Sequence, residues 1–426
     1  MQVFKYPDKS TWQELAKRPV QSIEEIELKV LPIIEDVKRN GDTALRKYAL
    51  QFDGVNITNL QVSDEELQAA DSLISNDLKD AIQLAYKNIY TFHSRQQTAV
   101  DVVETMPGVS CWRKSVAIEK VGLYIPGGSA PLFSTVLMLA IPAKIANCSE
   151  VVLCTPPDKN GKVHPAILYT AQLCGVTKII KAGGAQAIAA LAFGTESVPK
   201  VFKIFGPGNQ YVTAAKQIIN KTGVAIDMPA GPSEVLVIGD DEARPDFIAA
   251  DLLSQAEHGP DSQVIFITTE AAYLNMVNFA LEQQLKQLNR SDIAQRALEN
   301  SKIILLDNLD EAMDFSNLYA PEHLILQTKN AEELAEKAIN AGSVFIGHYS
   351  TESIGDYASG TNHTLPTNGF ATAYSGVSLD SFVKKITFQK VSKEGLNNIG
   401  KAVEIMAENE SLTAHKNAVT LRLNEL

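Results

Sequence analysis

Apolar residues recur at helical spacing through most of the first quarter of the chain. Two stretches show this pattern: Ile23, Ile26, Val30, Ile33 and Ile34 in the first, and Leu67, Ala70, Leu73, Leu78, Ile82 and Ala85 in the second. Side chains three or four positions apart share one face of a helix, so both stretches predict amphipathic helices between residues 22 and 95.

Further along, short apolar runs alternate with amphipathic stretches. Eight runs read as buried strands: residues 151–154, 179–180, 201–205, 235–238, 264–267, 303–305, 324–326 and 344–346. Helices are predicted between them, for example at 247–256, 271–285 and 309–317. This alternation is typical of an α/β fold with largely parallel sheet.

Eight strands are many for one small domain, so two stacked α/β units are predicted. The sequence Asp-Met-Pro-Ala-Gly-Pro at 227–232 breaks regular structure and marks a plausible boundary between them. A short strand at 385–388 is followed by helical sequence to the C-terminus. In open α/β sheets ligands bind outside the carboxyl ends of the strands, so functional residues are expected mostly in loops that follow strands.

Composition and charge narrow the class of protein. The 426 residues are 45% hydrophobic and 21% charged, with a net charge of −12, which disfavours a nucleic-acid partner. The first ten residues hold no apolar signal segment, and the longest apolar runs, 136–141 and 187–193, fall short of the roughly 18 residues of a membrane span. The four cysteines lack CxxC spacing. A cytoplasmic protein without membrane contact is expected.

Three segments carry residues that could perform chemistry. Gln255 and His258 are three apart near the end of a predicted helix, where they could share a ligand, although a terminal His more often serves as a cap. Glu322 and His323 precede a strand and could act as two proton-transfer groups, or could be an unremarkable surface pair. The polar loop 355–363 contains Asp356 and His363, and could be a plain solvated connection.

Two further polar residues, Glu410 and His415, lie in the helical tail and would read as surface residues if taken alone. Taken together, Gln255, His258, Asp356 and His415 offer nitrogen and oxygen ligands without thiolate. Such a set favours Zn²⁺ or Mn²⁺ and leaves room for substrate.

The nucleotide-binding motifs that would be easiest to recognise are missing. Neither G-x-G-x-x-G nor G-x-x-x-x-G-K-[ST] occurs. Glycine-containing turns follow strand-like runs at 124–128, 182–186 and 205–209, and the last of them opens a predicted helix whose N–H groups could meet a phosphate. Ordinary strand-to-helix turns would look the same.

The segment 226–240, Ile-Asp-Met-Pro-Ala-Gly-Pro-Ser-Glu-Val-Leu-Val-Ile-Gly-Asp, continuing through Ala-Asp-Leu-Leu-Ser-Gln-Ala-Glu-His at 250–258, closely resembles the signature of the histidinol dehydrogenase family. So do Tyr-Ile-Pro-Gly-Gly-Ser-Ala-Pro-Leu at 124–132, Tyr-Ala-Pro-Glu-His at 319–323 and Gly-Asp-Tyr-Ala-Ser-Gly-Thr-Asn-His at 355–363. The resemblance spans nearly the whole chain. A small departure is Gly239, at a strand end, where the family usually has Ala or Cys.

The resemblance implies a role for each residue. It implies a metal held by Gln255, His258, Asp356 and, from the partner subunit of a homodimer, His415, with one Zn²⁺ (or Mn²⁺) per subunit. Glu322 and His323 resemble the catalytic pair. The implied substrate contacts are Ser233, Gln255, His258, His323, Asp356, His363, Glu410 and His415, and the implied NAD contacts are Tyr124, Gln186 and Asn209.

The same resemblance implies the reaction and the organisation of the chain. L-histidinol would be oxidised to L-histidine through the bound aldehyde by two NAD⁺, the last step of histidine synthesis. The implied fold is two incomplete Rossmann-like units of the aldehyde dehydrogenase type. The expected division is an N-terminal arm (1–25), a first unit (26–115 with 232–375), a second, NAD-side unit (116–231) and a helical tail (376–426).

Two other functions are compatible with the residues themselves. The His/Asp/Gln set would also suit a metal hydrolase in which Glu322 or His323 activates metal-bound water without a nicotinamide. It would equally suit a metal-stabilised binding or regulatory protein with no turnover. Formation of NADH from histidinol separates both from a dehydrogenase.

Overall fold

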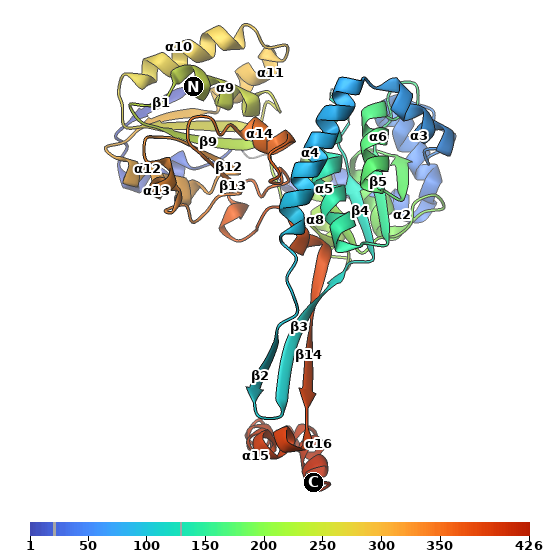
Figure 1. Cartoon of the computed structure of the whole chain (residues 1–426). Helices are drawn as coiled ribbons and strands as arrows, with labels where there is room; N and C mark the ends of the chain where they lie inside the picture. Colours follow the sequence, from blue (N-terminus) through green and yellow to red (C-terminus); the bar gives the residue numbers. More distant parts are fainter. Residues whose placement is uncertain (20–22, 128–129) are drawn as a thin grey trace.

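The structure is a computed structural model that describes residues 1–19, 23–127 and 130–426. It consists of two α/β units, here called the A unit and the B unit, and a long arm that projects away from both (Figure 1). Gly128 and Ser129, part of the sequence motif that begins at Tyr124, lie outside the described residues.

The B unit is built on a five-stranded parallel sheet with the order β6-β5-β4-β7-β8. Its strands are β4 (Lys120–Tyr124), β5 (Glu150–Thr155), β6 (Lys178–Lys181), β7 (Lys203–Phe205) and β8 (Ala225–Ile226). Its connecting helices are α5 (Phe133–Ala146), α6 (Pro165–Cys174), α7 (Gly184–Phe193) and α8 (Gln210–Asn220). Because β5 and β7 lie on opposite sides of β4, the order of strands reverses there, as in doubly wound nucleotide-binding folds.

Three helices from the first quarter of the chain complete the B unit. They are α2 (Ile23–Tyr48), α3 (Asp64–Ala70) and α4 (Asn76–Ser94). Val30 and Ile34 of α2 pack in one core with residues of α7 and α8, and Ile82 and Ile89 of α4 pack with α5. This corrects the expected division, which placed residues 26–115 with the other unit. Apolar spacing reveals that a helix has a buried face, but it does not reveal which sheet that face covers.

The A unit contains a six-stranded parallel sheet with the order β1-β11-β10-β9-β12-β13. Its strands are β1 (Gln2–Lys5), β9 (Glu234–Gly239), β10 (Gln263–Thr268), β11 (Lys302–Leu305), β12 (His323–Gln327) and β13 (Ser343–Ile346). Its helices are α1 (Trp12–Leu15), α9 (Pro245–Ala256), α10 (Tyr273–Leu285), α11 (Ser291–Glu299), α12 (Leu309–Tyr319), α13 (Ala331–Ala335) and α14 (Glu352–Tyr357). The N-terminal segment is part of this unit, since β1 extends the sheet and α1 buries Trp12 and Leu15 in its core.

The arm is a three-stranded antiparallel ribbon that ends in a helical foot (Figure 1). Its strands are β2 (Val102–Met106), β3 (Val109–Ala117) and β14 (Val383–Val391), and the foot is formed by α15 (Lys393–Asn409) and α16 (Thr413–Leu423). Short helical turns lie at Lys9–Thr11, Ala49–Asp53, Asp71–Leu73, Phe370–Thr372 and Leu379–Phe382.

Much of the predicted secondary structure is confirmed. All eight predicted core strands are present, the boundary at 227–232 lies between β8 and β9, and the strand at 385–388 forms the middle of β14. The predicted α/β class with parallel sheets is confirmed as well. Among the described residues, no helix is both long and apolar enough to cross a membrane.

Candidate active site

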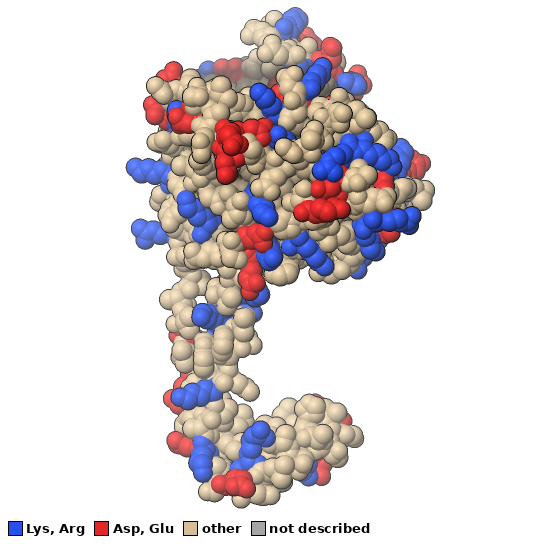
Figure 2. Space-filling view, turned by 90° about the vertical axis from the view of Figure 1, so that its right-hand side faces the viewer, with Lys and Arg blue, Asp and Glu red and all other residues tan. Residues whose placement is uncertain are grey.

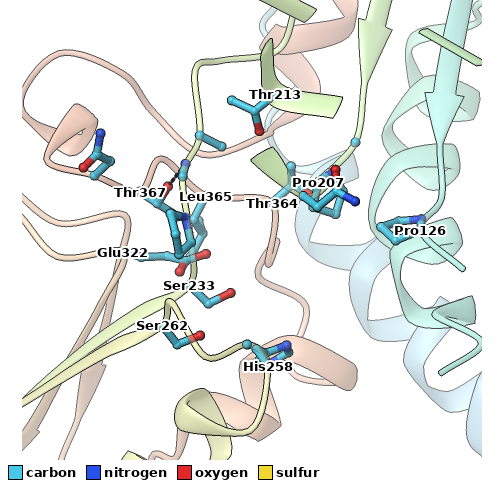
Figure 3. Close-up of a pocket in the computed structure, with 18 of the residues that line it drawn as sticks. Pro126, Pro207, Thr213, Ser233, His258, Ser262, Glu322, Thr364, Leu365 and Thr367 are labelled. Carbon is cyan, nitrogen blue, oxygen red and sulfur yellow. Dashed lines mark hydrogen bonds between the residues drawn. The ribbon is translucent and has the colours of Figure 1, made fainter. Parts of the chain in front are cut away.

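A cavity of about 440 Å³ lies between the two units and is lined by both of them (Figure 3). On the B side its walls follow strands: Pro126 comes after β4 and residues 206–210 come after β7. On the A side its walls precede strands: Ser233 comes before β9, Ser262 before β10 and Glu322 before β12.

The two sheets therefore present opposite ends to the cavity. The prediction that functional residues follow strands holds for the B unit and is wrong for the A unit. The reason is that helix α9 runs back along its sheet, so its final residues return to the edge where β9 and β12 begin. Gln255 and His258 reach the cavity in this way.

Glu322 immediately precedes β12 and His323 is its first residue, and both are buried, at 7% and 2% exposure. Both are held by the backbone of Glu234, the first residue of the neighbouring strand β9. Glu322 Oε2 accepts a hydrogen bond from Glu234 N at 2.9 Å, and His323 Nδ1 lies 3.0 Å from Glu234 O. Because a carbonyl oxygen can only accept, Nδ1 carries a proton. The other ring nitrogen, Nε2, is buried without a hydrogen-bond partner, 3.7 Å from Asp356 Oδ1.

The surroundings of Glu322 and His323 favour the protonated form of both side chains. Burial raises the pKa of Glu322 to about 8, although the neighbouring His323 opposes the shift. Burial disfavours the charged form of His323, but the carboxylates of Glu322 and Asp356 outweigh it and raise its pKa to about 10. Two adjacent groups with shifted pKa values beside a cavity are typical of acid–base chemistry.

Three of the four predicted metal ligands meet at this cavity. Gln255 and His258 come from the end of α9, and Asp356 comes from α14. Burial lowers the pKa of His258, while the positive charge of His323, whose Nε2 lies 3.7 Å from Asp356 Oδ1, keeps the pKa of Asp356 low in spite of its burial. Gln255 Oε1 is buried and has no hydrogen-bond partner.

The fourth predicted ligand is elsewhere in the chain. His415 lies on α16 in the foot and is exposed, as is Glu410 at the end of α15. The foot is at the far end of the arm from the cavity (Figure 1). Among the described residues, no group of three or more His, Cys, Asp or Glu side chains within one chain is placed to hold a metal.

Some of the other predicted substrate and NAD contacts line the cavity, and others do not. Ser233 and His363 line the cavity, with His363 Nδ1 2.9 Å from Asp356 O and His363 Nε2 3.1 Å from Thr135 Oγ1. Asn209 also lines it and caps α8 by accepting from two backbone N–H groups.

Tyr124 and Gln186, the two remaining predicted NAD contacts, are buried and do not line the cavity. Tyr124 Oη accepts from the Gly184 N–H at 3.1 Å, so it braces the turn that opens α7. Burial raises the pKa of Tyr124 to about 12, which keeps this hydroxyl protonated.

Sequence reasoning missed a buried ion pair that supports the B-side wall. Lys216 and Asp227 form this pair; Lys216 Nζ also donates to Gly206 O at 2.9 Å, and Asp227 Oδ2 accepts from Gly206 N at 2.8 Å. A signal was present, because Lys216 falls on the same face of α8 as Val212 and Ile219. A lysine on an apolar helix face needs a buried partner.

Taken together, the fold and the cavity define an α/β enzyme whose site joins a nucleotide-binding type of sheet edge to a buried acid–base pair. Comparison with known proteins is more specific. The family model for histidinol dehydrogenase matches residues 16–423. This chain therefore belongs to the histidinol dehydrogenase family.

Its relatives are similar over their full length. Histidinol dehydrogenase of Bacteroides thetaiotaomicron is 62% identical over 426 residues, covering 100% of both chains, and that of Escherichia coli K12 is 54% identical over 417 residues, covering 97% of this chain and 95% of the relative. The crystal structure of histidinol dehydrogenase from Elizabethkingia anophelis superposes with a TM-score of 0.97 at 58% identity, covering 100% of this chain and 98% of the other.

Gly206 in the B-side wall is packed closely against the backbone of Tyr124, which leads to a testable prediction. Its φ is +128°, and a Cβ at this position would collide with the Tyr124 carbonyl. We expect Gly206→Ala to destabilise the protein by about 2–4 kcal/mol, from the unfavourable φ and the displaced strand end together. Gly223→Ala is the matched control, since its φ is +94° and its Cβ would meet nothing within 4 Å. Urea unfolding of both variants checks this, and equal losses would contradict the proposed collision.

Proposed function

We propose that this chain is a cytoplasmic histidinol dehydrogenase that converts L-histidinol, two NAD⁺ and water into L-histidine and two NADH, the last step of histidine synthesis. The observation that carries the proposal is the buried Glu322–His323 pair beside Gln255, His258 and Asp356, in a chain of this family. All four cysteines are free, which agrees with a reducing compartment.

The residues at the cavity fit a Zn²⁺ ion, and would also accept Mn²⁺. Gln255 Nε2 lies 3.1 Å from His323 Nδ1. The other end of the same amide, Gln255 Oε1, is buried and has no hydrogen-bond partner. This oxygen, His258 and ionised Asp356 are donors of the type that Zn²⁺ and Mn²⁺ accept, and they would hold the ion. When bound, the ion would hold the imidazole and amino nitrogens of the substrate and neutralise Asp356, which lowers the pKa of His323 toward its ordinary range.

Glu322 and His323 then have different roles. Nε2 of His323 points away from the backbone that holds Nδ1, so it is the nitrogen that can accept the hydroxyl proton while the carbinol carbon loses a hydride to the first NAD⁺. Glu322 lies beside it and can deprotonate the water that adds to the aldehyde. The resulting diol loses its second hydride to a fresh NAD⁺, and the aldehyde stays bound between the two steps because a free amino aldehyde is reactive.

The positions of Glu410 and His415 lead us to propose a homodimer with shared sites. Both residues are on the foot, far from the cavity of their own chain (Figure 1). The arm and foot also carry exposed apolar side chains, among them Val102, Val103, Ile405, Met406 and Leu421. In the face shown in Figure 2, few charged side chains cover the ribbon of the arm. Surfaces of this kind mark protein–protein contacts, so the foot of one copy is proposed to complete the cavity of the other.

The first prediction concerns the activity itself. Purified protein with L-histidinol and NAD⁺ is expected to form two NADH per histidinol, followed by absorbance. Removal of metal with a chelator should abolish turnover and lower the thermal unfolding midpoint, and added Zn²⁺ should restore both, because an ion bound only by the folded state stabilises it. Absence of NADH with an intact, metal-loaded protein would favour the hydrolase or binding alternatives.

The second prediction separates the roles of the pair. His323→Asn should reduce turnover with histidinol by roughly 10²–10⁴-fold, the usual cost of losing a general base. Glu322→Gln should slow oxidation of added histidinaldehyde more than oxidation of histidinol to the aldehyde. Both half-reactions are measured in single turnovers at equal metal content. Near wild-type turnover of the first variant, or equal losses in the two half-reactions of the second, would contradict the assignment.

The third prediction tests the shared site. His323→Asn and His415→Ala chains should each be inactive alone. In co-expressed mixtures, random pairing gives one intact site in half of the dimers, so about a quarter of the wild-type activity should return. Two copies of either single variant, treated identically, are the controls. A mixture as inactive as its components would show that His415 does not serve the other subunit.

A further inference from the structure

The backbone of Glu234 fixes the catalytic pair, and its side chain is itself fixed by several contacts. It is 3% exposed and forms a two-point ion pair with Arg18, in which Arg18 Nε donates to Oε1 and Arg18 Nη2 donates to Oε2 at 2.9 Å. The Asn368 N–H also donates to Oε1 at 2.8 Å. The first residue of β9 therefore has a fixed backbone and a fixed side chain, and Arg18 supplies the charge that makes its burial tolerable.

Arg18 also contacts the turn that leads into β12. Its Nη2 donates to Tyr319 O at 2.7 Å and lies 3.4 Å from Ala320 O, and its guanidinium lies 3.9 Å from the centre of the Tyr319 ring. Ala320 has a φ of +51°, which is unfavourable for a residue other than glycine and persists only where its surroundings impose it. Glu322 follows two residues later, so the guanidinium contacts the approaches to both strands that carry the site.

Arg18 reaches this position from the N-terminal segment. Strand β1 pairs with β11, and α1 buries Trp12 and Leu15 against the A sheet, which fixes the chain just before Arg18. The N-terminal segment thus places the side chain of Arg18 between the first residues of β9 and the turn that leads into β12.

We propose that Arg18 is a positioning residue of the active site: by clamping Glu234 and the 319–320 turn, it fixes the two strand starts that aim Glu322 and His323 at the substrate. Arg18 itself is not among the residues that line the cavity. The inference rests on the proposed function for its kinetic readout, and on geometry alone for its second readout.

The kinetic test compares Arg18→Ala and Arg18→Lys with Lys17→Ala. Lys17 is the adjacent cation, its side chain is 68% exposed and, within the described part of the chain, it pairs with surface Glu14 alone, so its loss should change little. Displacement of catalytic groups by about 1 Å can cost on the order of 100-fold in rate, so we expect kcat of Arg18→Ala to fall about 100-fold while KM for histidinol stays within about twofold. Arg18→Lys keeps the charge but not the planar two-point geometry, and should recover only part of the rate. Full rescue by lysine, or a kcat of folded Arg18→Ala within about threefold of wild type, would overturn the proposal.

The second readout does not depend on turnover. The chain has seven histidines, so a spectrum of the protein labelled with ¹⁵N in its histidine rings is sparse enough to assign the Nδ1 proton of His323 by its disappearance in His323→Asn. In Arg18→Ala, and in the isosteric Glu234→Gln should the first variant fail to fold, this signal should shift and exchange faster with solvent. It should be unchanged in Lys17→Ala. An unmoved signal in the Arg18 and Glu234 variants overturns the positioning role, whereas absence of histidinol oxidation by the unaltered chain counts against the proposed function alone.

Discussion

The site depends on how two buried, ionisable side chains are satisfied at the point where a strand begins. His323 pairs in register with Val235, so Glu234 sits one residue before the ladder that joins β12 to β9. Its N–H and C=O are directed to Glu322 and His323. Backbone groups cannot rotate away as side chains can, and this fixes the tautomer of His323 and leaves one ring nitrogen for chemistry. Burial without such partners would cost more than the fold could tolerate.

This constraint explains why the cavity lies between opposite ends of the two sheets. The B unit offers the carboxyl end of a doubly wound sheet, where the neighbouring strands β4 and β7 are followed by helices that pack in different cores and where α8 begins, which suits a dinucleotide phosphate. The A unit offers the amino end, where the acid–base pair is anchored. The segment 227–233 crosses from one to the other and lines the cavity, so the boundary between the units is also part of the site.

The local pattern of the sequence predicted the parts of the fold that are shaped by burial. Eight of the eleven strands in the two sheets, the helix that brings Gln255 and His258 to one face, and the break at 227–232 follow from apolar spacing and from proline and glycine positions, whereas β1, β4 and β8 were not predicted. Strands β2 and β3 could not be predicted in this way, because most of their side chains are exposed or only half-buried and no core imposes an alternation on them. The contact of Arg18 with Glu234 joins residues 216 positions apart, and no local pattern encodes such a distance. The likeness to a known family supplied most of the site, since single motifs such as Glu322–His323 are also common on surfaces.

The arm is firmly attached to the B unit, and this attachment determines where its foot can lie. Phe382 at the base of β14 stacks on Phe205 of the B sheet with ring centres 4.0 Å apart, and Lys203 Nζ donates to Ser381 O at 2.8 Å. Strand β14 then pairs with β3 along nine residues. An arm rooted in the core and stiffened over this length holds its foot away from its own cavity instead of folding back onto it. The polar residues of the foot therefore lie far from the cavity of their own chain, and apolar side chains along the arm are uncovered, which is the physical basis of the proposed shared site.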